Sequence, residues 1–206
     1  MIKLENVSKS FDGKPVLSNF SIQIKENEFV SIVGKSGSGK TTVLNIMSLL
    51  DTPDKGNIEI LGYKNPKHKD VMNLRRKHLG YIFQNYVLMD NETVLTNLLL
   101  STEYAKDFNK NLLPEALEMV GLDKSFLKKK VYQLSGGEQQ RVAIARIILK
   151  PCDIILADEP TGNLDEYNKN IILFLFHQLR DMGKTIICVT HDQEIADCSD
   201  RVINLS

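Results

Sequence analysis

Hydrophobic and polar residues alternate in the first third of the chain, where Ile22 and Ile24, and later Ile58 and Ile60, are each separated by one polar residue. A spacing of two favours antiparallel strands that have one buried face and one face in water. The turn-forming stretch "DTPDKG" at 51–56 interrupts this pattern. The first third of the chain is therefore predicted to form an antiparallel sheet.

Longer hydrophobic runs without alternation occur near the C-terminus. "IILA" at 154–157 and "TIICVT" at 185–190 are almost entirely apolar, which is typical of parallel strands covered on both faces. The segment between them, "EYNKNIILFLFHQLRDMGK", has the length of a helix that stops at Gly183. The order strand, helix, strand predicts a right-handed parallel crossover, and hence an α/β fold.

The middle of the chain, roughly 71–135, has a different pattern. It contains amphipathic patches such as "LLPEALEMVGL", in which Pro114 suits a first helical turn, and no strong strand pattern. We therefore predict a helical subdomain there. The expected organisation is one domain over 1–206 with a helical subdomain inserted at approximately 85–150.

Composition narrows the possible partners and location. The chain has 206 residues with 26 basic and 26 acidic side chains, so no global field attracts nucleic acid, and we expect no nucleic-acid partner. Its 3 cysteines show no metal-ligand spacing and are expected to be reduced thiols in the cytosol. The run "IILFLF" at 171–176 is too short to span a bilayer, and the N-terminus lacks a signal-peptide pattern.

The stretch "IVGKSGSGKTT" at 32–42 places glycines directly after branched apolar residues. It fits the pattern G-x-x-x-x-G-K-[ST], a loop whose amides cradle phosphate. Lys40 is expected to bridge the β- and γ-phosphates, and the Thr41 hydroxyl to bind Mg²⁺. The nucleotide-binding residues predicted for this loop are Gly34, Lys35, Ser36, Gly37, Ser38, Gly39, Lys40, Thr41 and Thr42.

The predicted strand in "IILADEP" ends in two carboxylates, Asp158 and Glu159. Ligands of open α/β sheets bind at the carboxyl ends of the strands. Asp158 can therefore orient the Mg²⁺ shell, and Glu159 can hold a water. An isolated Asp-Glu-Pro is more typical of a turn or helix cap, but a phosphate loop in the same chain favours the binding site.

A second possible anion site is "LSGGEQQR" at 134–141, where Ser135 and two glycines precede a helix predicted to run to Leu149. An ordinary N-cap with a flexible entry explains the local pattern, but not a second phosphate-competent helix start in the same chain. His191, after the last apolar strand, can hydrogen-bond a γ-phosphate or can be structural. Gln84 is ambiguous alone, because a polar residue at a strand end usually meets water.

Taken in order, these motifs closely resemble the ATP-binding subunits of ABC transporters. The matching stretches are "GKSGSGKT", "YIFQ", "LSGGEQQR", "IILADEP", "NLD" and "VTHD". The resemblance covers essentially the whole chain, and "LSGGEQQR" is specific to that superfamily, whereas a phosphate loop is not. "DEPTGNLD", with "RRKHLGYIFQ" upstream, is most similar to the group of lipoprotein-releasing, macrolide-exporting, and antimicrobial-peptide or bacteriocin exporters.

The resemblance implies a fold and roles for single residues. The fold is a P-loop NTPase (RecA-like) core with an antiparallel β-subdomain and an inserted α-helical subdomain. Phe11 would stack on adenine where the family usually has tyrosine, Gln84 would contact Mg²⁺ and sense the permease, and Asp165 would lie in a loop that communicates across a dimer. The implied catalytic residues are Glu159 as general base, His191 at the γ-phosphate and Lys40; the implied metal ligands are Thr41, Gln84 and Asp158. Ser135, Gly136, Gly137 and Glu138 would complete the nucleotide site of a partner subunit.

The function implied is that of an ATP-hydrolysing motor subunit of a bacterial-type exporter of a peptide, lipoprotein or antimicrobial compound. Its cofactors would be ATP and Mg²⁺. Its partners would be an integral membrane permease and a second ATP-binding subunit, expected to be a copy of this chain. It would be cytoplasmic and held peripherally at the inner face of the cell membrane through the permease.

Two alternatives remain open at this point. One is a soluble ABC ATPase that acts in translation or DNA repair, although such relatives usually carry two cassettes or a long coiled-coil insertion, which this chain lacks. The other is the motor of an importer, which shares the chemistry but fits "DEPTGNLD" less well.

Overall fold

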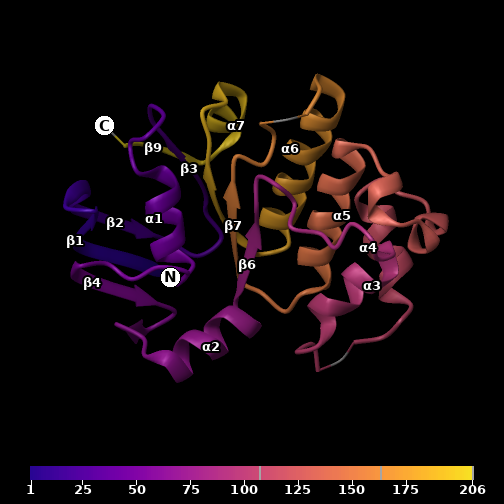
Figure 1. Cartoon of the computed structure of the whole chain (residues 1–206), viewed down its shortest axis with the longest axis horizontal. Coiled ribbons are helices and arrows are strands. Elements are labelled where there is room, and N and C mark those ends of the chain that lie inside the picture. Colours follow the sequence, from indigo (N-terminus) through magenta and orange to yellow (C-terminus); the bar gives the residue numbers. More distant parts are fainter. Residues whose placement is uncertain (107, 163, 206) are drawn as a thin grey trace.

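The computed structural model describes residues 1–106, 108–162 and 164–205. An antiparallel sheet, a parallel sheet and a group of helices follow one another across the molecule (Figure 1). The antiparallel sheet has the strand order β2-β1-β4-β5, and its strands are β1 (Ile2–Phe11), β2 (Lys14–Ile24), β4 (Lys55–Ile60) and β5 (Tyr63–Lys64). The parallel sheet has the order β6-β7-β8-β3-β9, and its strands are β3 (Phe29–Val33), β6 (Leu79–Ile82), β7 (Ile154–Asp158), β8 (Thr185–Val189) and β9 (Arg201–Asn204).

The helices lie on both sides of the parallel sheet. They are α1 (Lys40–Met47), α2 (His68–Lys77), α3 (Val94–Leu99), α4 (Leu112–Met119), α5 (Gly136–Leu149), α6 (Glu166–Asp181) and α7 (Gln193–Cys198). Three short 3₁₀ turns, at Leu100–Thr102, Lys124–Lys128 and Val131–Gln133, connect α3, α4 and α5. Among the described residues, none of the helices combines the length and the apolar character needed to cross a bilayer.

The alternating pattern of the first third is confirmed as an antiparallel sheet, with β1 at its centre. Ile2 pairs with Ile24 of β2 on one side and with Ile60 of β4 on the other, and all three side chains are fully buried. The sequence pattern predicts the strands but not that β1 separates β2 from β4.

The parallel unit predicted at the C-terminal end is also confirmed. β7 and β8 pair in parallel, with Ile154 opposite Thr185, and α6 connects them. Gly183 has a φ of 88°, a left-handed conformation that glycine adopts readily and that ends a helix.

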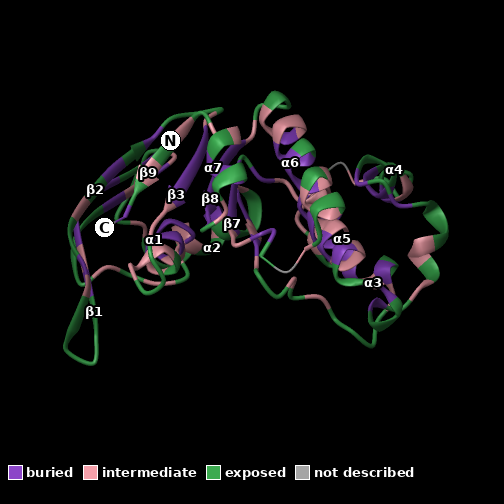
Figure 2. Cartoon of the chain, turned by 90° about the horizontal axis from the view of Figure 1, so that it is seen from above, coloured by how far each residue is buried: buried purple, intermediate pink, exposed green. Residues whose placement is uncertain are grey.

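The parallel sheet separates two hydrophobic cores because successive side chains of a strand point to opposite faces. Ile155 of β7 and Ile186 of β8 pack with α5 and α6, whereas Leu156 and Ile187 pack with α1 and the antiparallel sheet. Figure 2 shows the buried residues on both sides of the sheet. Phe29 of β3 lies edge-on to Phe176 of α6 in the first core, with ring centroids 5.8 Å apart.

The region 71–135, which has no strong strand pattern, contains one short strand, β6, which pairs with β7 at the edge of the parallel sheet. β6 has only four residues and directly follows a polar helix, so it shows no period of its own. Gly80 admits close neighbours: a Cβ there would lie 3.1 Å from Cys152 Sγ and 3.2 Å from Ile147 Cγ2. Tertiary packing rather than local propensity therefore makes this segment a strand.

Candidate functional site

The glycine-rich stretch forms the sharp turn that its composition predicts. β3 ends at Val33, and α1 begins at Lys40, directly after the loop. Gly37 and Gly39 have φ values of 80° and 93°, which other residues adopt only at a cost. Gly39 also lies against β2, since a Cβ there would be 3.0 Å from Leu17 Cδ2.

Polar groups of this loop point toward its interior. Lys40 Nζ donates hydrogen bonds to the Gly34 carbonyl at 2.9 Å and to the Lys35 carbonyl at 3.1 Å. Ser38 Oγ is buried and has no hydrogen-bond partner in the described ranges. Within the part of the chain that the structure describes, the Lys40 ammonium bonds to carbonyls and the buried Ser38 hydroxyl has no partner, which fits a loop that receives an anion.

Thr41 and Asp158 meet at the ends of α1 and β7. The Thr41 hydroxyl donates to Asp158 Oδ1 at 3.3 Å. Burial raises the pKa of the Asp158 carboxyl, and the Thr41 hydrogen bond opposes that effect. A hydroxyl beside a carboxylate is the oxygen donor set that Mg²⁺ prefers, and a cation there would offset the buried negative charge.

Glu159 lies beside the end of β8. Its Oε2 is 2.9 Å from His191 Nδ1 and accepts hydrogen bonds from Thr190 Oγ1 at 3.2 Å and from the His191 backbone N–H at 3.3 Å. The Glu159 side chain is 14% exposed, whereas that of His191 is 71% exposed. These described contacts all engage Oε2 of the carboxylate.

The backbone of Glu159 has a φ of 45°, in the left-handed region that non-glycine residues rarely adopt. Such conformations persist where the surrounding structure imposes them, and they concentrate at functional sites. The Glu159 N–H donates to the Val189 carbonyl at 2.9 Å, which fixes the turn after β7. The strained turn therefore directs the carboxylate toward the end of β8.

Gln84 lies at the same edge of the sheet, exposed just after β6. A Cβ on Gly162 would be 3.9 Å from Gln84 Nε2 and 3.8 Å from Glu159 Cβ, so the three residues are neighbours. The structure thus gathers the phosphate loop, Asp158, Glu159, His191 and Gln84 around the carboxyl ends of the parallel strands.

The segment after Gln84 is held by α5. Tyr86 and Val87 both have left-handed φ values, 59° and 48°. Arg146 of α5 donates to the Val87 carbonyl at 2.7 Å and to the Tyr86 carbonyl at 3.0 Å. A Cβ on Gly136 would lie 3.2 Å from the Tyr86 hydroxyl. This segment therefore connects the edge of the sheet with both ends of α5.

Ser135 and Glu138 form a reciprocal capping box at the start of α5. The Glu138 N–H donates to Ser135 Oγ at 3.3 Å, and the Ser135 N–H donates to Glu138 Oε2 at 2.8 Å. The N-cap interpretation of this stretch is thereby confirmed as local structure. α1 and α5 lie on opposite sides of the parallel sheet, so the capping box stands apart from the phosphate loop (Figures 1 and 2).

Asp165 caps the neighbouring helix α6. Its Oδ1 accepts hydrogen bonds from the Asn168 N–H and from Asn168 Nδ2, both at 2.8 Å, and the backbone hydrogen bond lowers the pKa of this carboxyl. Gly137 packs directly on Asn168, leaving no room for a Cβ. The starts of α5 and α6 therefore form one unit that carries both Ser135 and Asp165.

Phe11 is the last residue of β1 and pairs with Lys14 across the hairpin turn. It is 46% exposed, and Lys9 Nζ lies 5.2 Å from its ring centroid. The exposed ring is available for stacking, although no described hydrogen bond joins this hairpin tip to the phosphate loop.

Sequence reasoning missed Thr190, Lys9 and Arg146. Thr190 has a signal in the sequence, because it is the polar residue between an apolar strand and His191. Lys9 and Arg146 have none, because their contacts join residues far apart in the chain.

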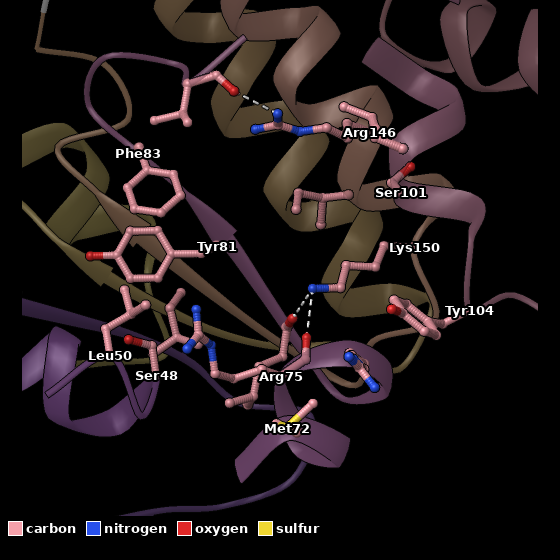
Figure 3. Close-up of a pocket in the computed structure, with 16 residues that line it drawn as sticks. Ser48, Leu50, Met72, Arg75, Tyr81, Phe83, Ser101, Tyr104, Arg146 and Lys150 are labelled. Carbon is pink, nitrogen blue, oxygen red and sulfur yellow. Dashed lines mark hydrogen bonds between the residues drawn. The ribbon is translucent and has the colours of Figure 1, made fainter. Parts of the chain in front are cut away.

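A groove of about 500 Å³ lies between α2, β6 and α5 (Figure 3). Its lining includes four cations and no carboxylate; the cations are Arg75, Arg76, Arg146 and Lys150. Lys150 Nζ donates to the carbonyls of Arg75 and Leu79 at 2.8 and 2.7 Å, and burial lowers its pKa. Tyr81 and Phe83 stack on one wall, with ring centroids 4.1 Å apart.

Comparisons with known proteins give consistent matches. The family described as "ABC transporter" matches residues 17–162. The lipoprotein-releasing system ATP-binding protein LolD of Bacteroides fragilis is 42% identical over 212 residues, covering 100% of this chain and 97% of the relative. The macrolide export ATP-binding/permease protein MacB of Campylobacter fetus is 41% identical over 214 residues, covering 100% of this chain and 33% of the relative.

A solved structure agrees with the fold. It is described as a dimeric structure of a post-hydrolysis state of the ATP-binding cassette MJ0796 bound to ADP and Pi. Its sequence is 39% identical to this chain, and the match covers 100% of this chain and 94% of that one with a TM-score of 0.90. The expected α/β architecture, with its antiparallel and parallel sheets, is confirmed.

Proposed function

Since the chain belongs to the ABC transporter family, we propose that it is the ATP-hydrolysing subunit of an exporter, coupled to a separate membrane permease. LolD and MacB relatives, named for lipoprotein release and macrolide export, favour export of a lipoprotein, peptide or antimicrobial compound. The chain would be held at the inner face of the cell membrane through the permease. Residues of about 85–150 would form a helical subdomain inserted in the core.

One observation carries the proposal. The phosphate loop, the Thr41–Asp158 pair and the Glu159–His191 pair lie together at the carboxyl ends of β3, β7 and β8. This is the edge at which open parallel sheets bind ligands. A cation, a metal-type oxygen pair and a carboxylate base are the parts that hydrolysis of a nucleoside triphosphate requires.

Each part has a role toward ATP. The amides of 34–39 and the Lys40 ammonium bind the β- and γ-phosphates, and Lys40 exchanges its two carbonyl partners for phosphate oxygens. Thr41 and Asp158, with Gln84 nearby, would hold Mg²⁺, which when bound neutralises phosphate charge. The exposed Phe11 ring would stack on the base.

Glu159 acts as the general base. Its Oε2 is held by Thr190 and His191, so the other oxygen can accept a proton from an attacking water without reorganisation. His191 is exposed and can donate a hydrogen bond to the γ-phosphate. No covalent intermediate is needed, because alignment of the water and charge stabilisation suffice.

A second copy of the chain would complete the site. Ser135 starts α5 on the other side of the parallel sheet from the phosphate loop, so its exposed helix start is available to a neighbouring molecule. The dimeric state of the MJ0796 cassette supports this arrangement. Asp165, on the same unit as Ser135, would then lie near the contact between the two copies.

Replacing Lys40 with alanine is expected to weaken ATP binding about ten- to hundredfold, because the triphosphate loses a charge-assisted partner. Isothermal titration calorimetry with ATP measures the loss. Lys55→Ala, at an exposed position of β4, is the matched control and should bind as the parent does. An unchanged affinity of Lys40→Ala would rule out the phosphate-loop assignment.

The groove is the proposed docking site of the permease. Its four cations face no carboxylate in the lining, although the whole chain has 26 acidic residues to balance 26 basic ones. Tyr81, Phe83 and Leu100 add apolar surface. A permease segment that carries both acidic and apolar side chains complements this surface. Val87 lines the same groove and links it to Gln84.

Arg75→Glu is expected to reduce co-purification with the permease about tenfold or more, because a like charge replaces an attractive one at a docking surface. The ATPase activity of the isolated subunit should stay unchanged. Lys69→Glu is the matched control, since Lys69 is exposed on the same helix but does not line the groove. If both variants co-purify with the permease equally well, the groove is not the docking site. If the chain is recovered with ribosomes or DNA instead of a permease, the alternative of a soluble ABC ATPase in translation or DNA repair is favoured.

A further inference from the structure

Lys9 is an unusual residue in this fold. It is 9% exposed and is the one charged residue among the buried polar residues of the described part of the chain. Its ammonium lies 2.8 Å from Asp51 Oδ1, 2.7 Å from the Thr52 carbonyl and 3.6 Å from Asp54 Oδ1. The hydrogen bond with Asp51 raises the pKa of Lys9 and keeps it charged. The mechanism proposed above does not use this residue.

We infer that Lys9 is a positioning residue for nucleotide binding, which holds the Phe11 ring in place relative to the phosphate loop. This inference rests on the proposed role of Phe11 as the surface on which the base stacks. Lys9 itself touches no part of the nucleotide.

The contacts of Lys9 join β1 to the segment that follows α1. The Ser10 N–H donates to Asp54 Oδ2 at 2.7 Å, and the Asp54 N–H donates to the Ser8 carbonyl at 2.9 Å. The register of β1 on β2 shifts on both sides of Lys9, so the regular ladder is interrupted there. The ion pairs of Lys9 therefore hold β1 in place where its regular pairing with β2 is interrupted.

The start of α1 is attached to the same hairpin. Gly39 packs against Leu17 and Val16 of β2, and Leu17 pairs with Lys9 across the hairpin. The hairpin thus contacts the N-cap of α1 through β2 and the segment 51–54, which follows α1, through β1. Two attachments at opposite ends of a short helix fix the orientation of the hairpin, and with it the position of Phe11.

Lys9 also acts on the ring directly. Its ammonium lies over the Phe11 ring, 5.2 Å from the centroid, within the range of a cation–π interaction. The ring is therefore held on one face by a buried cation, while the other face can receive a base. Loss of the cation would release both the ring and the end of β1.

The test separates positioning from a general contribution to folding. Calorimetry measures the affinity of ATP and of inorganic tripolyphosphate, which has no base, for the parent chain and for Lys9→Met, Phe11→Ala and the double variant. Lys9→Met is expected to lower the affinity for ATP about five- to tenfold, which is within the range of one lost base-stacking contact. Its affinity for tripolyphosphate should stay unchanged. In the Phe11→Ala background, Lys9→Met should have no further effect on ATP, because no ring remains to be positioned.

Three further variants complete the design. Lys9→Arg, which keeps the charge, should restore most of the ATP affinity. Lys3→Met is the matched control, because Lys3 lies on the same strand in an exposed pair with Glu5. Asp54→Ala removes the half-exposed carboxylate that accepts the Ser10 N–H. It should lower the affinity for ATP but not for tripolyphosphate, and it provides this test even if Lys9→Met does not fold.

Several results would overturn the inference. If Lys9→Met lowers the affinities for ATP and for tripolyphosphate equally, Lys9 stabilises the fold rather than positioning the ring. Additive losses of ATP affinity in the double variant would lead to the same conclusion. If Phe11→Ala lowers the affinity for ATP but neither Lys9→Met nor Asp54→Ala does, the positioning role of Lys9 is wrong and the stacking role of Phe11 stands. If Phe11→Ala leaves ATP binding unchanged, the proposed stacking role of Phe11 fails, and the role of Lys9 fails with it.

Discussion

Replacing Glu159 with glutamine is expected to lower the rate of ATP hydrolysis about 10²–10⁴-fold while ATP still binds. Glutamine keeps the size of the side chain and can still accept a hydrogen bond from Thr190, but its amide cannot take a proton from water. Phosphate release measured in single-turnover and steady-state conditions gives the rate, and calorimetry gives the affinity. The variant should therefore accumulate in the ATP-bound state.

The control for this substitution is Glu118→Gln, at an exposed position of α4 distant from the strand ends in the sequence and in the fold. Its hydrolysis rate should equal that of the parent. If Glu159→Gln hydrolyses ATP at the parental rate, Glu159 is not the base. If it loses ATP binding as well, the Glu159 carboxylate contributes to the binding of ATP rather than only to its hydrolysis.

Mixing two inactive variants is expected to restore hydrolysis. Lys40→Ala removes the cation of the phosphate loop, and Ser135→Arg places a bulky side chain at the start of α5, so each variant alone should lose about 10²-fold or more of its activity. In a two-fold dimer each site combines one phosphate loop with the Ser135 of the other copy. The mixed dimer then has one site with both changes and one site with neither.

The mixed dimer should therefore reach up to about half of the parental rate, since one of its two sites is intact. Copies with different affinity tags are purified in tandem, so that only mixed dimers are assayed. A mixture of Lys40→Ala with a second tagged Lys40→Ala is the control and should stay inactive. A confirmed mixed dimer that is no faster than its parents would mean that Ser135 serves its own subunit, and the shared site would be wrong.

Much of the fold was predictable because its strands and helices carry strong local patterns. The alternation in β2 and β4 indicates strands with one buried face, and the continuous apolar run of β8 indicates a strand buried on both faces. The glycine after α6 indicates the end of a helix. β6 has no strong pattern of its own, because its four residues are held as a strand by pairing with β7. The central position of β1 likewise depends on pairing between distant segments, which local patterns do not contain.

The candidate site divides in the same way. The phosphate loop and the two carboxylates after β7 could be found because glycines, a lysine and paired acids are unusual beside buried strands. The contact of Glu159 with Thr190 and His191 could not, because it depends on β7 and β8 lying side by side. Asp165 was expected as a residue of a dimer loop, and the structure adds that it caps α6 through Asn168. That second role follows from Asp165 preceding a helix.

The place of β3 in the parallel sheet has a consequence for synthesis of the chain on the ribosome. β3 leads into the phosphate loop, yet it is flanked by β8 and β9, which come much later in the chain. Gly34 of the loop also packs against the backbone of Leu205. Until those C-terminal strands emerge, the apolar residues of β3 have no sheet to join and are exposed to aggregation. The phosphate loop can therefore bind nucleotide only after β8 and β9 have been synthesised.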